Sequence, residues 1–220
     1  MTSETWTAVD DYLTGLLIPA DAALDGTQRA AAAAGLPAIS VSAPHGKFLH
    51  LLARIAGARR ILEIGTLAGY STIWLARALP PDGRLISLEF DPKHADVARA
   101  NLERAGLSGI VDLRVGRAIE ALPALAADER FDFVFIDADK PSTPAYFDWA
   151  LRLTRSGGLI VVDNVVRKGG VTDTSGADRD VEGMRQFLAK LAQEPRASGT
   201  VIQTVGAKGY DGFALILVKK

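Results

Sequence analysis

Two strongly apolar segments of this 220-residue sequence are each followed at once by residues that could bind a metal ion or move a proton. The segment FVFI precedes Asp137, Asp139 and Lys140, and the segment LIVV precedes Asp163 and Asn164. A carboxylate that ends a buried strand is costly to desolvate unless a partner offsets the cost. Two carboxylates and an amide oxygen are hard donors, which suit Mg²⁺ or another divalent cation and leave coordination positions for a substrate.

These polar residues also have a purely structural interpretation. Asp137 and Asp163 could cap loops or form ion pairs with Lys140 and Arg167, and Lys140 could be an exposed loop lysine. We favour a metal site because the pattern occurs at two strand ends, in a chain that also carries the glycine-bearing turn described next.

That turn lies in the run RILEIGTLAGYS at 60–71, where Gly65 and Gly69 bracket three residues and an apolar helical stretch opens at Ser71. Glycine permits positive φ and lets a ligand approach the backbone. The run resembles the first motif of the class I S-adenosylmethionine (SAM) methyltransferases, and its spacing differs from the dinucleotide-binding G-x-G-x-x-G. Glu63 would repel a pyrophosphate but attract the ammonium and sulfonium of SAM. A tight turn that binds nothing is the alternative.

Two further segments could contact the nucleoside of such a ligand. Glu89 ends an expected strand and could accept hydrogen bonds from both ribose hydroxyls, a feature shared with NAD-binding proteins. It could instead cap the helix that begins at Pro92. Gly116 and Ala118 place small residues where a flat adenine could lie, although a plain helix start explains them almost equally well.

The elements that position these residues alternate between strand and helix after a helical N-terminal segment. Strands are expected at 60–64, 84–90, 110–115, 131–137, 158–163, 200–205 and 212–218. Helices are expected at 6–18, 21–34, 45–56, 71–79, 93–105, 117–127, 144–153 and 178–193, with a polar loop at 167–176. The short connection between the last two strands favours an antiparallel hairpin. The order predicts a doubly wound, mostly parallel sheet, in which ligands bind at the carboxyl ends of the strands.

The segments LEIGTLAGYST, VFIDADK and VVDNVV, with Glu89 between the first two, resemble the cation-dependent O-methyltransferases, the group of catechol and caffeoyl-CoA O-methyltransferases and their bacterial relatives. The resemblance covers about residues 40–220. It implies the class I SAM-methyltransferase, Rossmann-like α/β fold, with a mostly parallel seven-stranded sheet, a C-terminal antiparallel hairpin and N-terminal helices. It also implies one domain over 1–220, made of a helical lid at 1–57 and a SAM-binding core at 58–220.

The resemblance further implies roles for individual residues. The implied metal ligands are Asp137, Asp163 and Asn164. The implied SAM contacts are Val41 through its backbone, Glu63, Gly65, Thr66, Ser71, Glu89, Ala118, Asp137 and Asp139. Lys140 would be the catalytic base, with Asp137 also in the catalytic group. The sequence departs from the family pattern around Gly46, where it has His45 and Lys47.

The reaction that the resemblance implies is methyl transfer from SAM to a hydroxyl of a catechol-like aromatic small molecule, a vicinal diol. A phenol is a poor nucleophile until it ionises, and its pKa is near 10. A divalent cation bound by one of two adjacent hydroxyls would lower that pKa, and Lys140 would accept the proton. The sequence does not identify the acceptor beyond this class.

Composition narrows the remaining possibilities. The net charge of −1 offers no broad attraction to nucleic acid or to an anionic membrane, and the absence of cysteine excludes disulfides and thiolate metal sites. No signal peptide or membrane span is visible, so a cytoplasmic protein is expected. The apolar surplus of the first two helices, together with the resemblance, predicts a homodimer.

Two other function classes stay open at this point. A methyltransferase of nucleic acid or protein would be expected to show a basic surface or an Asn-Pro-Pro-aromatic motif, and neither is present. A non-catalytic SAM-binding protein would be expected to lack Lys140 or a metal ligand, and all of these are present.

Overall fold

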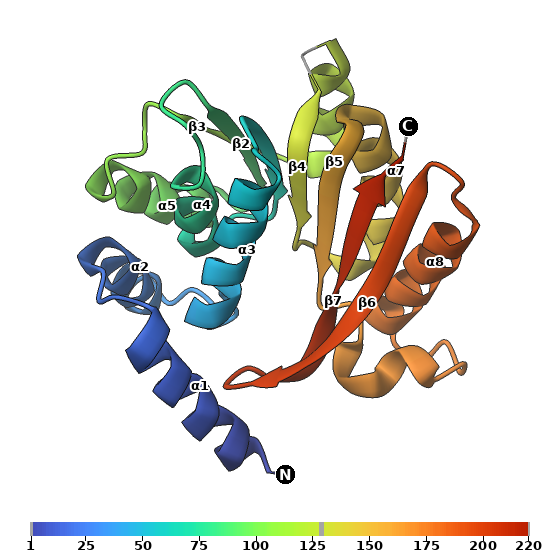
Figure 1. Cartoon of the computed structure of the whole chain (residues 1–220), viewed down its shortest axis with the longest axis horizontal. Helices are drawn as coiled ribbons and strands as arrows, with labels where there is room; N and C mark the ends of the chain where they lie inside the picture. Colours follow the sequence, from blue (N-terminus) through green and yellow to red (C-terminus); the bar gives the residue numbers. More distant parts are fainter. Residues whose placement is uncertain (1, 128–129, 220) are drawn as a thin grey trace.

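A computed structural model describes residues 2–127 and 130–219, and in this part of the chain seven strands form one sheet with helices on both faces (Figure 1). The strands are β1 (Arg60–Ile64), β2 (Arg84–Glu89), β3 (Val111–Val115), β4 (Phe131–Ile136), β5 (Thr154–Asp163), β6 (Ala197–Gly206) and β7 (Gly209–Val218). Their order across the sheet is β3-β2-β1-β4-β5-β7-β6. The first five are parallel, whereas β7 runs antiparallel to both β5 and β6. The predicted fold class and the terminal hairpin are therefore confirmed.

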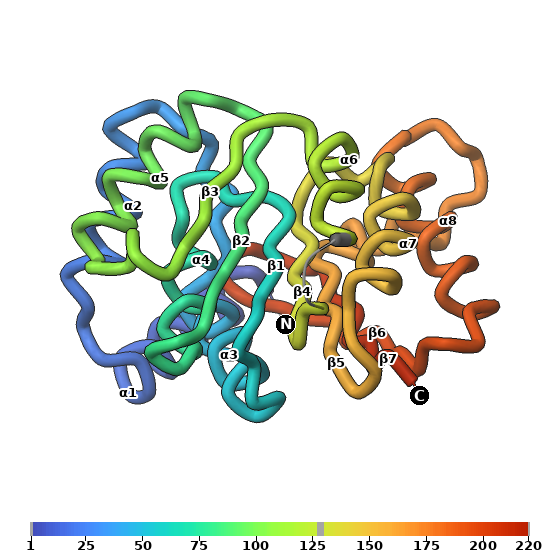
Figure 2. The backbone as a smooth tube through the Cα atoms, turned by 90° about the horizontal axis from the view of Figure 1, so that it is seen from above, coloured from blue at the N-terminus to red at the C-terminus, as the bar shows by residue number. Residues whose placement is uncertain are grey.

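Helices cover the two faces of the sheet in separate layers (Figure 2). The helices are α1 (Ser3–Leu17), α2 (Ala22–Ala33), α3 (Ala43–Ile55), α4 (Tyr70–Ala76), α5 (Pro92–Arg104), α6 (Ala118–Ala121), α7 (Thr143–Leu153) and α8 (Arg179–Gln193), with 3-10 turns η1 (Leu122–Ala127), η2 (Lys140–Ser142) and η3 (Arg167–Thr172). One face packs against α2 to α5 and the other against α6 to α8.

The central parallel strands β1, β4 and β5 are largely apolar on both sides because both sides are covered. In β4, Phe133 and Phe135 pack toward α3 and α4, while Val134 and Ile136 pack toward α7 and α8. All four side chains are fully buried or nearly so. This two-sided burial explains why the central strands lack an alternating polar pattern.

Several expected elements differ from those observed, and strands β5 and β7 begin at Thr154 and Gly209, earlier than the expected 158 and 212. The helix expected at 117–127 is only the short α6 followed by η1, since Pro123 has no N–H to donate to an α-helical hydrogen bond. The loop expected at 167–176 contains η3, with Arg167 and Lys168 in the left-handed region. Strand β6 begins at Ala197, because it pairs with β7 along its whole length from Ala197 with Val218 to Gly206 with Gly209.

Helix α1 stands apart from the two layers (Figure 1). None of its residues is buried, and it lies beside the tip of the β6–β7 hairpin, where the Ala207 N–H donates to Oδ2 of Asp10 at 2.8 Å. The division into a lid at 1–57 and a core at 58–220 stays a prediction, and its terminal residues 1 and 220 lie outside the described residues. Within the described chain, no helix combines the length and apolar character that crossing a membrane would require.

Candidate active site

A cavity of about 910 Å³ opens at the carboxyl ends of β1, β2 and β4. This is the edge of the sheet where the topology predicts ligand binding, and the volume is within the range of small-molecule sites. The predicted site residues that line it are Val41, Gly65, Thr66, Ser71, Glu89, Ala118, Asp137, Asp139, Lys140 and Asn164. Two predicted residues, Glu63 and Asp163, are not part of this lining.

The turn between β1 and α4 brings two strand ends into contact. Gly65 has a φ of 98°, and a Cβ at this position would collide with the backbone carbonyl of Asp137. Gly69 also has positive φ and is the N-cap residue of α4. The predicted positive φ at both glycines is thus confirmed, and at Gly65 the close approach of the chain at Asp137 also leaves no room for a side chain.

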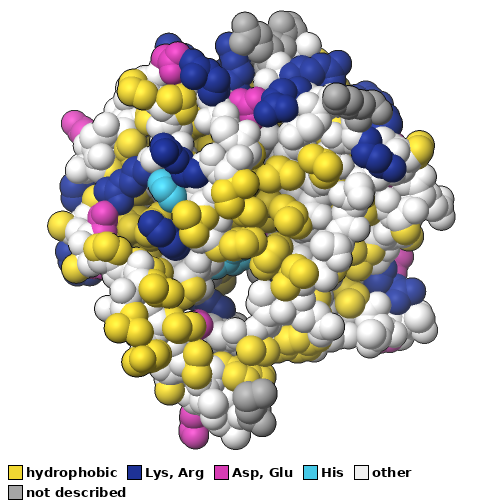
Figure 3. Space-filling model, viewed as in Figure 1, with side chains coloured by type: hydrophobic (Ala, Val, Ile, Leu, Met, Phe, Trp, Pro, Cys, Tyr) yellow, Lys and Arg dark blue, Asp and Glu magenta, His cyan; other side chains and the backbone are white. Residues whose placement is uncertain are grey.

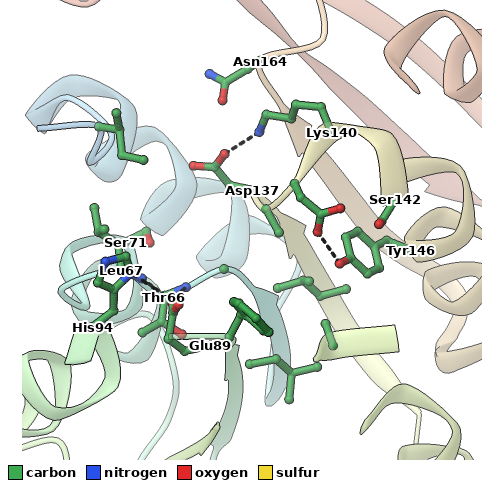
Figure 4. Close-up of a pocket in the computed structure, with 18 of the residues that line it drawn as sticks. Thr66, Leu67, Ser71, Glu89, His94, Asp137, Lys140, Ser142, Tyr146 and Asn164 are labelled. Carbon is green, nitrogen blue, oxygen red and sulfur yellow. Dashed lines mark hydrogen bonds and ion pairs between the residues drawn. The ribbon is translucent and has the colours of Figure 1, made fainter. Parts of the chain in front are cut away.

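Glu89 fixes the same turn from the end of β2. Its Oε2 accepts hydrogen bonds from the backbone N–H groups of Thr66 at 3.1 Å and Leu67 at 2.7 Å (Figure 4). Helix α5 has its own cap, since Oδ1 of Asp91 accepts from the N–H of Lys93 at 2.8 Å. Glu89 accepts the Asp91 N–H at 2.9 Å, so it supports the start of α5 without being its cap. It still lines the cavity, and it is only 7% exposed.

Glu63 lies behind the cavity wall. Its carboxylate is fully buried and accepts hydrogen bonds from the hydroxyls of Ser71 at 2.6 Å, Thr72 at 2.5 Å and Ser87 at 2.6 Å. Burial raises the pKa of Glu63 to about 7, against the opposing effect of these three hydrogen bonds. The Ser71 side chain lies between this carboxylate and the cavity, so Glu63 would not contact a ligand in the cavity directly.

The polar strand ends meet at another part of the cavity (Figure 4). The Nζ atom of Lys140, a residue only 8% exposed, donates to Oδ1 of Asp137 at 2.8 Å. Asn164 faces this pair from the end of β5, with its backbone in the left-handed region at a φ of 56°. Gly183 lets α8 approach closely, since a Cβ there would collide with the carbonyl of Lys140. The segment that carries Lys140 is therefore clamped between the sheet and α8.

Asp163 is buried directly beneath Asn164. Its Oδ1 accepts the Asn164 N–H at 2.8 Å, and its Oδ2 lies 3.7 Å from Nδ1 of His45. Burial raises the pKa of Asp163; the His45 ring opposes this shift and the nearby Asp137 carboxylate adds to it. Of the two ion pairs in the structural alternative, the structure contains Asp137 with Lys140, whereas Arg167 pairs with Asp180 at 3.0 Å and not with Asp163.

The donor chemistry of this region fits a hard divalent cation. No cluster of three or more histidine, cysteine, aspartate and glutamate side chains suited to a metal ion occurs within residues 2–127 and 130–219. The predicted set is of a different kind, because the amide of Asn164 joins the carboxylates of Asp137 and Asp163. These are oxygen donors of the type Mg²⁺ prefers. A cation between the two carboxylates would also offset the mutual repulsion that contributes to the raised pKa of Asp163.

Several residues that line the cavity are not among the predicted site residues. Tyr146 on α7 donates its hydroxyl to Oδ1 of Asp139 at 2.5 Å, and burial together with this carboxylate raises the pKa of Tyr146 (Figure 4). Arg167 and Asp180 come from η3 and α8. No local motif marks any of these residues. Tyr146 reads as part of the apolar face of a helix, and Arg167 as one charge in a polar loop.

Comparison with known proteins finds close relatives over the whole chain. The family model described as O-methyltransferase matches residues 20–219. A protein named catechol O-methyltransferase from Niastella koreensis is 52% identical over 221 residues, covering 100% of both chains. Another of the same name, from Mycobacterium tuberculosis, is 53% identical over 211 residues, which are 96% of this chain and 95% of that one.

Solved structures of the same fold hold the methyl donor or its product. An O-methyltransferase from Bacillus cereus, in complex with S-adenosylhomocysteine (SAH), superposes with a TM-score of 0.97 at 55% identity, over 99% of this chain and 100% of that chain. The O-methyltransferase TomG from Streptomyces achromogenes, in complex with SAM, has a TM-score of 0.97 at 51% identity, over 100% of both chains.

Proposed function

This chain belongs to the O-methyltransferase family and is a SAM-dependent O-methyltransferase, and on that premise we propose that its acceptor is a catechol-like aromatic diol, methylated with the help of a divalent cation. The two catechol O-methyltransferases at 52% and 53% identity support this acceptor class.

One observation carries the proposal. A single cavity is lined both by the turn and strand end suited to SAM, Gly65 and Glu89, and by the polar group of Asp137, Lys140 and Asn164. A methyl donor on the first set and an acceptor hydroxyl on the second would share one enclosed space. Positioning of this kind is itself a large part of the catalysis of a group transfer.

We assign SAM to the side of the cavity formed by β1, β2 and the start of α6. Glu89 would accept hydrogen bonds from the ribose hydroxyls, Ala118 would lie against the adenine, and Asp139 would contribute an acceptor held in place by Tyr146. The methionine part of SAM would contact the cavity wall, where the predicted ligand contacts are Val41, Gly65, Thr66 and Ser71. Glu63 would favour the positive ligand from behind Ser71 through its charge rather than by contact.

Asp137, Asp163 and Asn164 would hold the divalent cation, which supplies Lewis-acid activation of the acceptor hydroxyl. Lys140 would receive the hydroxyl proton at Nζ, and Asp137 orients that nitrogen through the 2.8 Å contact. The burial of Lys140 limits the access of water to the base, so that Nζ would take its proton from the acceptor hydroxyl.

Turnover with and without the metal tests the proposal. Catechol and phenol are incubated with SAM, and SAH is measured. Catechol should react much faster than phenol, EDTA should abolish the reaction, and Mg²⁺ should restore it. Asp163→Ala should behave like chelated enzyme while keeping its thermal transition. Undiminished turnover of thoroughly chelated enzyme would contradict the role of the cation, and equal rates for the two acceptors would contradict the diol specificity.

We also propose that the enzyme is a homodimer formed through α1. Helix α1 exposes Val9, Tyr12, Leu13, Leu16 and Leu17 and buries none of its residues. Hydrophobic side chains gather on the face of the molecule that carries α1 and α3 (Figure 3). An apolar helix face of this kind is stabilised when a second copy covers it.

A further inference from the structure

We propose that Arg167 selects acceptors with an anionic substituent, so that the preferred substrate is an aromatic diol that also carries a carboxylate. This inference rests on the proposed function and deepens it, because it concerns the acceptor side of the same cavity. It assigns to η3 a recognition role that the reaction chemistry does not require.

The position of Arg167 is the first observation. It lines the cavity together with Asn164, which lies three residues earlier in the chain, and with Asp180. An acceptor whose hydroxyls lie near Asn164 and Lys140 would therefore extend its ring substituents toward η3 and α8. The methyl-donor side, with Glu89 and Ala118, is built from other elements of the sheet.

The guanidinium has donors to offer. Its Nη2 atom donates to Oδ2 of Asp180 at 3.0 Å, and within the described residues no other acceptor takes a hydrogen bond from it. A guanidinium carries five N–H donors arranged as a fork that matches a carboxylate. The Arg167 side chain is 28% exposed and that of Asp180 is 45% exposed, so their ion pair is of the weak, exchangeable kind.

The backbone holds Arg167 in an unfavourable conformation, which is the second observation. Arg167 and Lys168 have φ values of 53° and 56°, a region that side-chain-bearing residues rarely adopt. Oδ1 of Asp211 accepts from the N–H groups of Val166 at 3.0 Å and Arg167 at 2.9 Å, which stabilises the turn. Two consecutive residues with left-handed backbone, held by the partly buried carboxylate of Asp211, are typical of a functional constraint.

The rest of η3 is tied to α8. Arg185 donates to the carbonyl of Val171 at 2.9 Å, and Gly170 allows the close approach of Val181, since a Cβ there would lie 2.8 Å from a Val181 methyl group. The guanidinium is therefore presented to the cavity from a braced segment. A carboxylate that arrives there gains a charge-assisted contact without ordering the loop first.

Lys168 provides a matched control. It is adjacent, has the same charge and the same left-handed backbone, yet it is exposed and does not line the cavity. We compare wild type, Arg167→Gln, Lys168→Gln and Asp180→Asn with two acceptors of similar size, 3,4-dihydroxybenzoate and the neutral 3,4-dihydroxybenzyl alcohol. KM and kcat are measured for each acceptor, together with SAM affinity and the thermal transition.

Arg167→Gln should raise the KM for the benzoate about tenfold, the effect of losing one charge-assisted hydrogen bond, with the KM for the alcohol unchanged. Lys168→Gln should leave both KM values unchanged. Asp180→Asn should lower the KM for the benzoate, because it removes the competing carboxylate from Arg167. The opposite directions of the Arg167 and Asp180 variants distinguish recognition from a general loss of structure.

Equal effects of Arg167→Gln on both acceptors, or none on either, would overturn the inference and leave Arg167 as a brace between η3 and α8. A selective loss of SAM affinity in Arg167→Gln would also overturn it, since Arg167 would then bind the carboxylate of SAM and not that of the acceptor. If wild type methylates neither diol, the proposed function fails. Calorimetric binding of the benzoate in the presence of SAH then tests the role of Arg167 without turnover. Weaker binding to Arg167→Gln than to wild type would support the inference, and unchanged binding would contradict it.

Discussion

The Nζ atom of Lys140 lies 2.8 Å from Oδ1 of Asp137, so the proposed base and a proposed metal ligand are in direct contact. This contact has two possible purposes. Lys140 could serve only to hold Asp137 in place through its positive charge, and an arginine side chain would do the same. It could instead take the proton of the acceptor, which an arginine cannot do because its guanidinium stays protonated in proteins.

The variants Lys140→Met and Lys140→Arg separate these purposes. Both should lower kcat by about a hundredfold or more, the usual contribution of a positioned base, and neither should change SAM affinity much, because a base acts in the transition state. Steady-state kinetics and calorimetry supply the two readouts. Recovery of most activity in Lys140→Arg would instead show that the ion pair with Asp137 is the whole role of Lys140.

Loss of the Glu89 carboxylate should weaken SAM binding. Removing a charged hydrogen-bond partner costs about 1.5–3 kcal/mol, so Glu89→Ala should reduce the affinity by roughly ten- to a hundredfold in calorimetry. The control is Asp91→Ala, which removes the cap of α5 and should lower the thermal transition while leaving SAM affinity unchanged. If both variants lose only stability, Glu89 serves the start of α5 and not the ribose.

The buried carboxyl of Glu63 should make stability depend on pH. Its pKa is about 7 in the folded protein, compared with an ordinary value of 4.5. The folded state therefore binds more protons than the unfolded chain between these values. The favourable contribution of the protonated group is fully present below about pH 4.5 and is lost as the pH rises through about 7.

Denaturant unfolding at several pH values in this window checks the Glu63 prediction. The free energy of unfolding of wild type should fall as the pH rises, and Glu63→Gln should flatten that part of the curve. Glu103→Gln, at an exposed position on α5, serves as the control and should keep the wild-type slope. An unchanged slope in Glu63→Gln would assign the pH dependence to other groups.

The exposed apolar side of α1 leads to a prediction about assembly. Tyr12 and Leu16 are 68% and 63% exposed, one turn apart on this helix. Light scattering at micromolar concentration should give twice the mass of the chain, and Leu16→Glu should give the monomer mass. Thr7→Glu adds the same charge on the opposite side of α1, nine residues away at 100° per residue, and should remain dimeric. A wild-type monomer would rule out the dimer.

Much of the fold could be predicted because its determinants are local. The central strands β1, β4 and β5 are largely buried on both faces, so their apolar runs stand out in the sequence, and the glycines mark the turn that follows β1. The carboxyl ends of such strands must meet at one edge. Residues as distant as Glu89, Asp137 and Asn164 were therefore placed in one cavity without any structural information.

The contacts of individual site residues could not be predicted, because they depend on which elements come together in space. Glu63 was expected to contact SAM because the family resemblance implies it and because its charge would attract the positive ligand. The sequence does not reveal that hydroxyls from α4 and β2, those of Ser71, Thr72 and Ser87, surround its carboxylate, or that Ser71 lies between it and the cavity. Arg167 was left out of the predicted site for a similar reason, since its left-handed backbone depends on Asp211, which is 44 residues away.

The place of β7 in the sheet has a consequence for synthesis on the ribosome. This strand lies between β5 and β6, although translation produces it after both. A nascent chain that has reached only β6 therefore has an open edge on β5 and no sheet partner for β6. Its α1 also lacks the hairpin tip whose Ala207 N–H donates to Asp10 in the folded protein. Open strand edges recruit other chains. A stalled or truncated product that lacks β7 should consequently depend on chaperones and aggregate, while a chain that contains β7 fills the gap between β5 and β6.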